Sequence, residues 1–359
     1  VLMNEDTSHT FGIYLHIPFC SRRCDYCSFA TWTDRDHLIG QYLAACKQQV
    51  DQWVEELPEI TSVFVGGGTP NLVPAESLMS VLAELPLAED AEFTVECNPD
   101  LVTFEQIDCY RQAGVNRISL GVQSMVPEIL TSLGRDHNPD NVYSATEQIR
   151  SAGISNINFD LIYGAKGESP EDWRKSLDLA LSLEPQHLSA YALTVEPGTP
   201  LAEDSSRHPE DDDQAEKYVI ADQVLTEADY SNYEISNWAQ PNSECQHNLL
   251  YWHQGEYLGL GVAAHSHIAH KRFWSIRTPE RFIAAITEGS SVEAGQERLD
   301  AESWALEGRQ LALRTRRGVP EEFVPNEVRH LTESAVVSGN LKLSRDGRLL
   351  ANEVAIRLR

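Results

Sequence analysis

The chain alternates short apolar runs with amphipathic segments six times between residues 11 and 193. The apolar runs have the length of buried strands, and the segments between them space their apolar residues as helices do. Strict alternation of strand and helix favours a parallel sheet with crossover helices. The predicted strands cover residues 11–17, 61–65, 92–95, 117–122, 154–162 and 187–193. The predicted helices cover residues 37–56, 74–85, 103–113, 141–151 and 171–183, with a further helix that ends near Leu133.

Six such units are too few for a closed eight-stranded barrel. The sequence therefore predicts an α/β fold, a partial (β/α)6 barrel followed by a smaller α+β C-terminal domain. After about residue 200 the alternation stops; helices are expected at 214–228 and 302–313, and a hairpin at 345–348, where Asp346-Gly347 is a turn signal. We expect a tail at 1–10, the barrel at 11–237 and the C-terminal domain at 238–359.

The charge and composition exclude several classes of function. The formal net charge of −27 opposes binding to nucleic acid, whose phosphates attract Lys and Arg. Hydrophobic residues make up 42% of the chain, which suits a packed core rather than a disordered chain. No run approaches the length of an apolar transmembrane helix, and the polar residues 1–10 do not resemble a secretory signal. The seven cysteines do not form a disulfide pattern, which favours a cytoplasmic location.

Three of the cysteines, Cys20, Cys24 and Cys27, follow the first predicted strand with the spacing C-x3-C-x2-C. Structural zinc takes four protein ligands, and most iron–sulfur clusters take four thiolates. Three close thiols without an obvious fourth suggest a [4Fe–4S] cluster with one iron open to another ligand. The alternative is a structural zinc site completed by a distant residue.

Polar and glycine residues also gather where other predicted strands end. A Gly-Gly-Gly-Thr-Pro run at 66–70 follows the second strand, and Glu96 and Gln123 end the third and fourth. In α/β barrels the carboxyl ends of the strands carry the active site. Glycines without a Cβ let the backbone approach a ligand closely, although such a run is also typical of a plain tight turn. The sequence thus places its candidate site on the same face as the cysteines.

The cysteine motif and the Gly-Gly-Gly-Thr-Pro run together resemble the radical S-adenosylmethionine (SAM) superfamily. The segments at 14–20 (YLHIPFC), 96–99 (ECNP), 121–124 (GVQS) and 158–161 (NFDL) are similar to the subgroup that contains oxygen-independent coproporphyrinogen III oxidase and the HemW-type haem chaperones. The resemblance runs from about residue 11 to the end of the chain. It implies a radical SAM barrel and a C-terminal domain like that of this subgroup.

The resemblance implies cofactors and their residues. Cys20, Cys24 and Cys27 would hold a [4Fe–4S] cluster, and its electron would cleave SAM to methionine and a 5′-deoxyadenosyl radical. The positions that match the SAM-binding residues of the family are Tyr14, Tyr26, Gly67, Gly68, Thr69, Glu96, Gln123, Arg135 and Asp160. Taken alone, each tyrosine is also typical of a core residue, and Glu96 of a surface carboxylate.

Two departures separate the chain from the oxidase pattern. Phe29 stands where that pattern has a fourth cysteine, and few residues precede the first strand. Both features favour the chaperone branch over decarboxylation of coproporphyrinogen.

The segment at 245–252 (CQHNLLYW) contains an H-N-x-x-Y-W motif that resembles the one associated with haem binding in this branch. His247 is the candidate haem ligand, with Cys245 as an alternative, and Asn248, Tyr251 and Trp252 complete the candidate haem site. A hydrogen-bonded core histidine is the competing interpretation, and His265 and His267 receive no role.

The resemblance predicts a cytoplasmic haem chaperone that holds a [4Fe–4S] cluster, SAM and haem and passes haem to haem-requiring acceptor proteins. It leaves open a homodimer and peripheral contact with a membrane through partners. The alternative is a radical SAM enzyme that decarboxylates coproporphyrinogen III to protoporphyrinogen IX; a structural zinc protein is the third interpretation.

Overall fold

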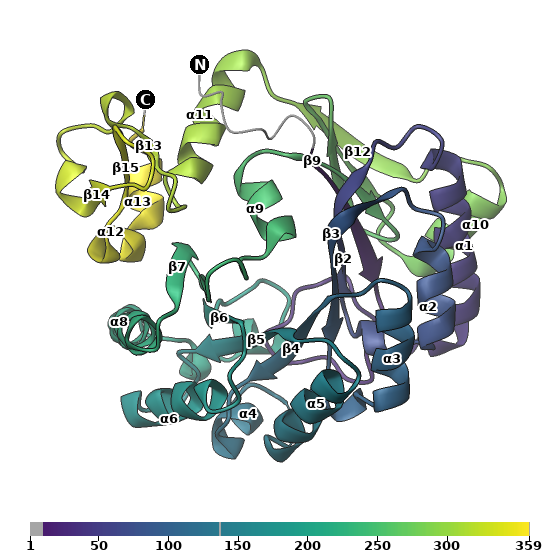
Figure 1. Ribbon diagram of the computed structural model, residues 1–359, viewed down its shortest axis with the longest axis horizontal. Helices are drawn as coiled ribbons and strands as arrows, with labels where there is room; N and C mark the ends of the chain where they lie inside the picture. Colours follow the sequence, from purple (N-terminus) through teal and green to yellow (C-terminus); the bar gives the residue numbers. More distant parts are fainter. Residues whose placement is uncertain (1–9, 136–137, 359) are drawn as a thin grey trace.

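A computed structural model of the chain describes residues 10–135 and 138–358. Its main feature is one strongly curved sheet of twelve strands in the order β12-β11-β10-β9-β1-β2-β3-β4-β5-β6-β8-β7. Helices cover the outside of the curve, and helix α9 (Gln246–Trp252) lies inside it (Figure 1). The two end strands of the sheet, β12 and β7, are not paired with each other, so the barrel is open.

The six predicted strands form the central part of this sheet. They are β1 (Phe11–Ile17), β2 (Ile60–Gly67), β3 (Leu87–Cys97), β4 (Arg117–Gln123), β5 (Asn156–Tyr163) and β6 (His187–Ala192), each parallel to the next. The crossovers contain α1 (Ile39–Trp53), α2 (Ala75–Leu82), α3 (Phe104–Gln112), α4 (Pro127–Ser132), α5 (Asp140–Ser151) and α6 (Pro170–Leu181). The α/β fold with a partial barrel is confirmed.

Shorter strands from later in the sequence extend the sheet on both sides. Strand β9 (Glu256–Leu260) pairs in parallel with β1, and β10 (His265–Ile268), β11 (Lys271–Ser275) and β12 (Glu293–Arg298) continue antiparallel. On the other side β8 (Asn237–Ala239) and β7 (Ser231–Glu234) follow β6 antiparallel. Strand β9 thus completes the sheet around β1, and the division of the chain at residue 237 stays a prediction.

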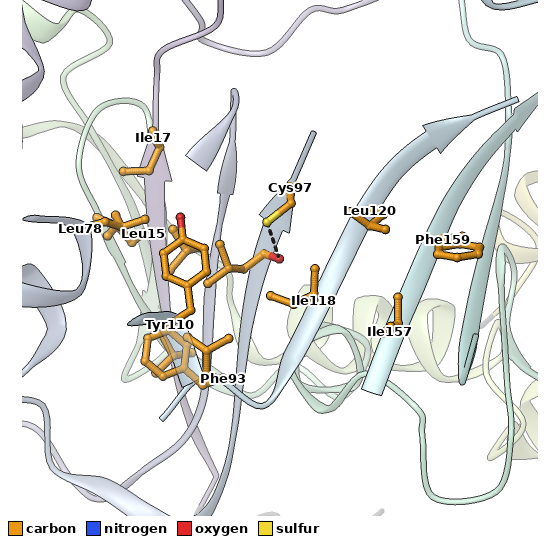
Figure 2. Packing of buried hydrophobic residues seen from close by; sticks show 14 of the residues in the cluster. Leu15, Ile17, Leu78, Phe93, Cys97, Tyr110, Ile118, Leu120, Ile157 and Phe159 are labelled. Carbon is orange, nitrogen blue, oxygen red and sulfur yellow. Dashed lines mark hydrogen bonds between the residues drawn. The ribbon is translucent and has the colours of Figure 1, made fainter. Parts of the chain in front are cut away.

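The core lies between the sheet and its outer helices. Ile13, Leu15 and Ile17 alternate along β1 and are fully buried, as the period of two in a strand requires. Figure 2 shows Leu15 and Ile17 beside Leu78 of α2, Tyr110 of α3 and apolar residues of β3, β4 and β5. Apolar contacts with the helices cover the outer face of the sheet. Polar side chains therefore lie at the carboxyl ends of the strands and on the inner face of the sheet.

The remaining elements flank the later strands of the sheet or form a separate small lobe. Helices α7 (Pro200–Glu203) and α8 (Asp211–Glu227) follow β6, and α10 (Pro279–Thr287) and α11 (Ala301–Ala312) flank the last strands. A three-stranded sheet, β13 (Val319–Pro320), β15 (Asn340–Leu343) and β14 (Thr332–Ser334), forms a small lobe with α12 (Arg345–Leu349) and α13 (Ala351–Ala355). This lobe lies next to α8 and β7 (Figure 1). Among the described residues, no helix combines the length and apolarity needed to cross a bilayer.

The predicted hairpin at 345–348 is wrong, because these residues form helix α12. Ser344 caps the helix: its hydroxyl accepts a hydrogen bond from the Gly347 amide at 3.1 Å. A Cβ on Gly347 would lie 1.9 Å from the carbonyl oxygen of Leu331, so glycine serves close packing here rather than a turn. The Asp346-Gly347 pair is typical of a turn, but the Ser344 cap and the packing of Gly347 against Leu331 favour a helix instead.

Candidate functional site

The loop that carries the three cysteines follows β1 and is closed at its base by backbone hydrogen bonds. The Cys20 amide donates to the Trp32 carbonyl at 3.1 Å, and the Trp32 amide donates to the Pro18 carbonyl at 2.8 Å. The end of β2 is attached to the same base, since the Gly68 amide donates to Ile17 O at 2.7 Å. The cysteine loop is therefore fixed to two adjacent strand ends.

The three thiols line one cavity of about 430 Å³, here named the loop cavity. Donors reach two of the sulfurs: Thr69 Oγ1 lies 3.5 Å from Cys20 Sγ, and Arg135 Nη1 lies 3.5 Å from Cys24 Sγ. Burial raises the pKa values of the Cys20 and Cys27 thiols. Within residues 10–135 and 138–358, no three Cys, His, Asp or Glu side chains converge as ligands of a single metal ion.

The glycine run at the end of β2 has a tight structural role. A Cβ on Gly68 would lie 2.7 Å from Phe19 O and 3.0 Å from Cys20 Sγ, and one on Gly67 would lie 2.5 Å from the His16 ring. Gly67 also has φ of +107°, which favours glycine. The absence of side chains here lets the β2 end contact the cysteine loop directly.

Glu96, at the end of β3, lies where three cavities meet. It lines the loop cavity, a central cavity of about 160 Å³ and a third cavity of about 430 Å³ that is named the histidine cavity because it is lined by His16, His265 and His267. Its carboxylate accepts a hydrogen bond from the Gly67 amide at 3.1 Å. Burial, reinforced by the nearby charge of Asp160, raises the pKa of Glu96 to about 8.

Replacing Glu96 with Gln should change how stability depends on pH. Because the pKa of Glu96 is raised by folding, the unfolded chain ionises first, and stability falls as pH rises from about 4.5 towards 8. Gln loses no proton, so the free energy of unfolding of Glu96→Gln should exceed that of the parent chain by about 1–2 kcal/mol at pH 8 and equal it near pH 4.5. This difference is smaller than the full pKa shift implies, because solvent screens the partly exposed carboxylate. Urea unfolding at both pH values measures this; an equal difference at the two pH values would contradict it.

Asp160, at the middle of β5, is held by two neighbouring side chains. Ser119 Oγ donates to its Oδ2 at 2.7 Å, and Asn158 Nδ2 donates to its Oδ1 at 2.9 Å. The side chain of Arg135 is anchored by a bond from its Nη2 to Gly121 O at 2.7 Å, while its buried Nε has no partner. A buried donor without a partner is unusual and marks a position for an acceptor.

The structure brings nearly all of the predicted SAM residues together. The loop cavity is lined by Tyr26, Gly67, Gly68, Thr69, Glu96, Gln123, Arg135 and Asp160, together with the three cysteines. Tyr14 instead lines the central and histidine cavities, where its hydroxyl donates to His16 Nδ1 at 3.0 Å. Tyr26 also packs against a small apolar cluster that includes Val126 and Leu133.

Helix α9, which carries the H-N-x-x-Y-W motif, is held inside the barrel by Glu92 of β3. The Glu92 carboxylate accepts from the Gln246 and His247 amides, both at 3.0 Å, and from the Cys245 thiol at 3.4 Å. These are the first amides of a helix, which otherwise lack acceptors. Sequence reasoning missed Glu92, because a carboxylate within a strand gives no signal of a partner about 150 residues later.

The motif is divided between two faces of α9. His247 is buried; its Nδ1 hydrogen-bonds Ser62 Oγ at 2.9 Å and its Nε2 bonds the Tyr251 hydroxyl at 2.7 Å. Burial lowers the pKa of His247 to about 3. Both ring nitrogens have partners, so His247 would exchange one of them before it could bind iron. Cys245 is likewise buried and bonded to Glu92.

Asn248 and Trp252 lie on the other face of α9, one turn apart. Both line a fourth cavity of about 440 Å³ between α9 and the C-terminal lobe. We name this the arginine cavity, because Arg314 and Arg348 line it as well. The motif therefore lines three cavities: Asn248 and Trp252 line the arginine cavity, His247, Asn248 and Tyr251 the central cavity, and Tyr251 the histidine cavity.

A chain of hydrogen bonds connects Asp160 to Asn248. His187 Nδ1 donates to Asn158 Oδ1 at 2.6 Å, and its Nε2 accepts from the Tyr233 hydroxyl at 2.8 Å. Asn248 Nδ2 donates to the same hydroxyl at 3.3 Å, which completes the connection. His187 and Tyr233 were not predicted, since neither follows a motif.

Comparison with known proteins adds the family. Residues 14–180 match the model of the radical SAM superfamily. The chain is 37% identical over 365 residues to "Heme chaperone HemW" of Mycobacterium tuberculosis, covering 96% of this chain and 93% of that protein. It is 31% identical to the protein of that name in Bacillus subtilis, covering 95% and 97%.

Among solved structures, the coproporphyrinogen III oxidase HemN of Escherichia coli superimposes with a TM-score of 0.82 at 21% identity, covering 97% of this chain and 90% of that one. At that identity the likeness shows the fold. The identity to the HemW proteins over nearly the whole length, on a fold with the cysteine loop and α9 placed as described, shows that this chain belongs to the radical SAM superfamily and, within it, to the HemW family.

Proposed function

We propose that this chain is a cytoplasmic haem chaperone that binds haem and delivers it to haem-requiring proteins, respiratory or other, as a monomer or a homodimer. The observation that carries the proposal is the near full-length similarity to proteins named heme chaperone HemW. The position of α9 supports it, because the H-N-x-x-Y-W segment lines cavities that adjoin the loop cavity through Glu96 and Tyr191.

The donor set of the loop cavity fits a [4Fe–4S] cluster on Cys20, Cys24 and Cys27. Three thiols around a wide cavity suit a four-iron cluster better than one zinc ion, whose ligands lie about 2.3 Å from a common point. When bound, the cluster supplies an electron for reductive cleavage of SAM. Thr69 and Arg135 would donate to the cysteine sulfurs and stabilise their thiolate form.

The residues beside the cysteines fit SAM. Arg135 has a buried Nε without an acceptor, which suits the SAM carboxylate, and Glu96 offers an acceptor to its ammonium group. Asp160, oriented by Ser119 and Asn158, would accept from ribose hydroxyls. Phe29 is 62% exposed and lines both the loop and histidine cavities, where it would exclude water from the cluster.

The test is retention and transfer of haem by the anaerobically reconstituted chain. We expect the chain to retain haem through gel filtration and to pass it to an apo-haem protein, seen as a shift of the Soret band to the acceptor's position. Failure of either step contradicts the proposal. Sustained anaerobic conversion of coproporphyrinogen III to protoporphyrinogen IX would instead favour the decarboxylase.

A further inference from the structure

Two arginines, Arg314 and Arg348, line the arginine cavity of a strongly acidic chain. The chain has 55 acidic and 28 basic residues, so carboxylate partners are plentiful. The hydrogen bonds of Arg314 nevertheless go to neutral acceptors: its Nη1 donates to Gln310 O at 2.7 Å and its Nη2 to Asn352 Oδ1 at 2.9 Å. A half-buried guanidinium without a carboxylate is a binding position for an anion.

Two further side chains that line the same cavity have donor atoms without partners. Arg348 uses its Nη2 for an ion pair with Asp222 at 3.1 Å, but its buried Nε and Nη1 have no acceptor. The indole Nε1 of Trp252 is also buried without a partner. Buried polar groups in native proteins nearly always have partners, so exceptions on one cavity wall indicate a missing acceptor.

The acidic residues of this cavity are already engaged. Glu353 forms an ion pair with Arg357 at 2.7 Å. Glu234 accepts from Asn237 Nδ2 and from the Ser236 amide, and burial raises its pKa, which lowers its charge. Neither carboxylate satisfies Arg314 or the free atoms of Arg348.

Apolar side chains form part of the wall, beside polar ones such as Asn237 and Asn248. Trp252, Ile235, Leu349 and Leu350 line the cavity, and the two leucines are 38% and 46% exposed. The matching ligand carries carboxylates on a broad apolar body, since its body would cover the leucines while its carboxylates meet the arginines. A porphyrin with two propionate groups has this chemistry.

We propose that the arginine cavity receives the propionate groups of haem, with Arg314 and Arg348 as their cationic partners and Trp252 as a further donor. The inference rests on the proposed function, because it names where a bound haem is held. It assigns recognition of the porphyrin edge to two arginines outside the H-N-x-x-Y-W motif and to Trp252 within it, and Asn248 of the motif lines the same cavity.

The test compares haem with haem dimethyl ester, whose propionates carry no charge. Dissociation constants are measured by Soret titration for the full chain and for Arg314→Gln, Arg314→Lys and Arg348→Gln. The control is Arg329→Gln, an exposed arginine outside the cavity that pairs with Glu321. We expect Arg314→Gln to weaken haem binding tenfold to a hundredfold, as loss of a charged hydrogen bond does. Arg314→Lys should recover part of this loss.

The ester should bind the parent chain at least tenfold more weakly than haem does. It should bind Arg314→Gln as tightly as it binds the parent chain. Iron-free protoporphyrin IX, followed by its fluorescence, should show the same dependence on Arg314 as haem. The inference is overturned if Arg314→Gln binds haem as tightly as Arg329→Gln, or if the parent chain binds haem and its ester equally. A parent chain that binds no haem overturns the proposed function and the inference together, whereas haem binding without dependence on the arginines overturns the inference alone.

Discussion

Cys24→Ala is expected to lose its iron almost completely, from about four irons per chain to fewer than one after anaerobic reconstitution. All three cysteines lie on the loop that is closed by the hydrogen bond between Cys20 and Trp32. Because the cluster would have only three protein ligands, the loss of one would leave two. Cys20→Ala and Cys27→Ala should behave alike. Iron and sulfide analysis, together with the visible absorption of the cluster, measures the effect.

The matched control is Cys109→Ala, a half-buried cysteine on α3 that does not line the loop cavity and should keep four irons. A Cys24→Ala chain that still holds four irons would show that another thiol replaces it. Cys97 is the candidate, since it lines the same cavity. Zinc in place of iron in the parent chain would contradict the cluster itself.

Glu92→Ala is expected to lower the free energy of unfolding by about 3–5 kcal/mol, the range for breaking a buried charged network. The substitution removes the acceptor of two amides of α9 and of the Cys245 thiol, and it removes one of the carboxylates near Arg117, which is only 2% exposed. Helix α9 would lose its anchor inside the barrel, so haem affinity should fall as well. Urea unfolding and the Soret titration measure the two effects.

Glu92→Gln keeps an acceptor oxygen and should lose about half as much, since the amides remain bonded while the charge is gone. Glu89→Ala, an exposed acid on the same strand, should change stability by less than about 0.5 kcal/mol. Equal stability of Glu92→Ala and Glu89→Ala would show that α9 is held by its apolar contacts alone.

The sequence predicted those parts of the molecule that depend on local order. The alternation of Ile13, Leu15 and Ile17 predicts strand β1. Glu96 and Gln123 could be assigned to the site because parallel strands bring their carboxyl ends together. These rules need only the position of a residue within its own strand.

The parts that depend on docking between distant segments could not be predicted. Arg314 reaches the cavity beside Trp252 only because the C-terminal lobe packs next to α8 and β7 (Figure 1), and no motif surrounds it. The burial of His247 depends on Ser62 and Phe64 of β2, which lie 185 and 183 residues earlier. Both features follow from contacts between distant segments, and such contacts produce no periodic pattern of apolar residues in the sequence.

The strand that carries the cysteine loop is the first in the chain but lies within the sheet, between β2 and β9. Its second neighbour, Glu256–Leu260, is synthesised about 240 residues after it, and such long-range pairing is slow to form. During synthesis β1 therefore has an unpaired edge until most of the chain has left the ribosome, and exposed edges invite aggregation. A product truncated before Glu256 therefore lacks the strand that covers one edge of β1.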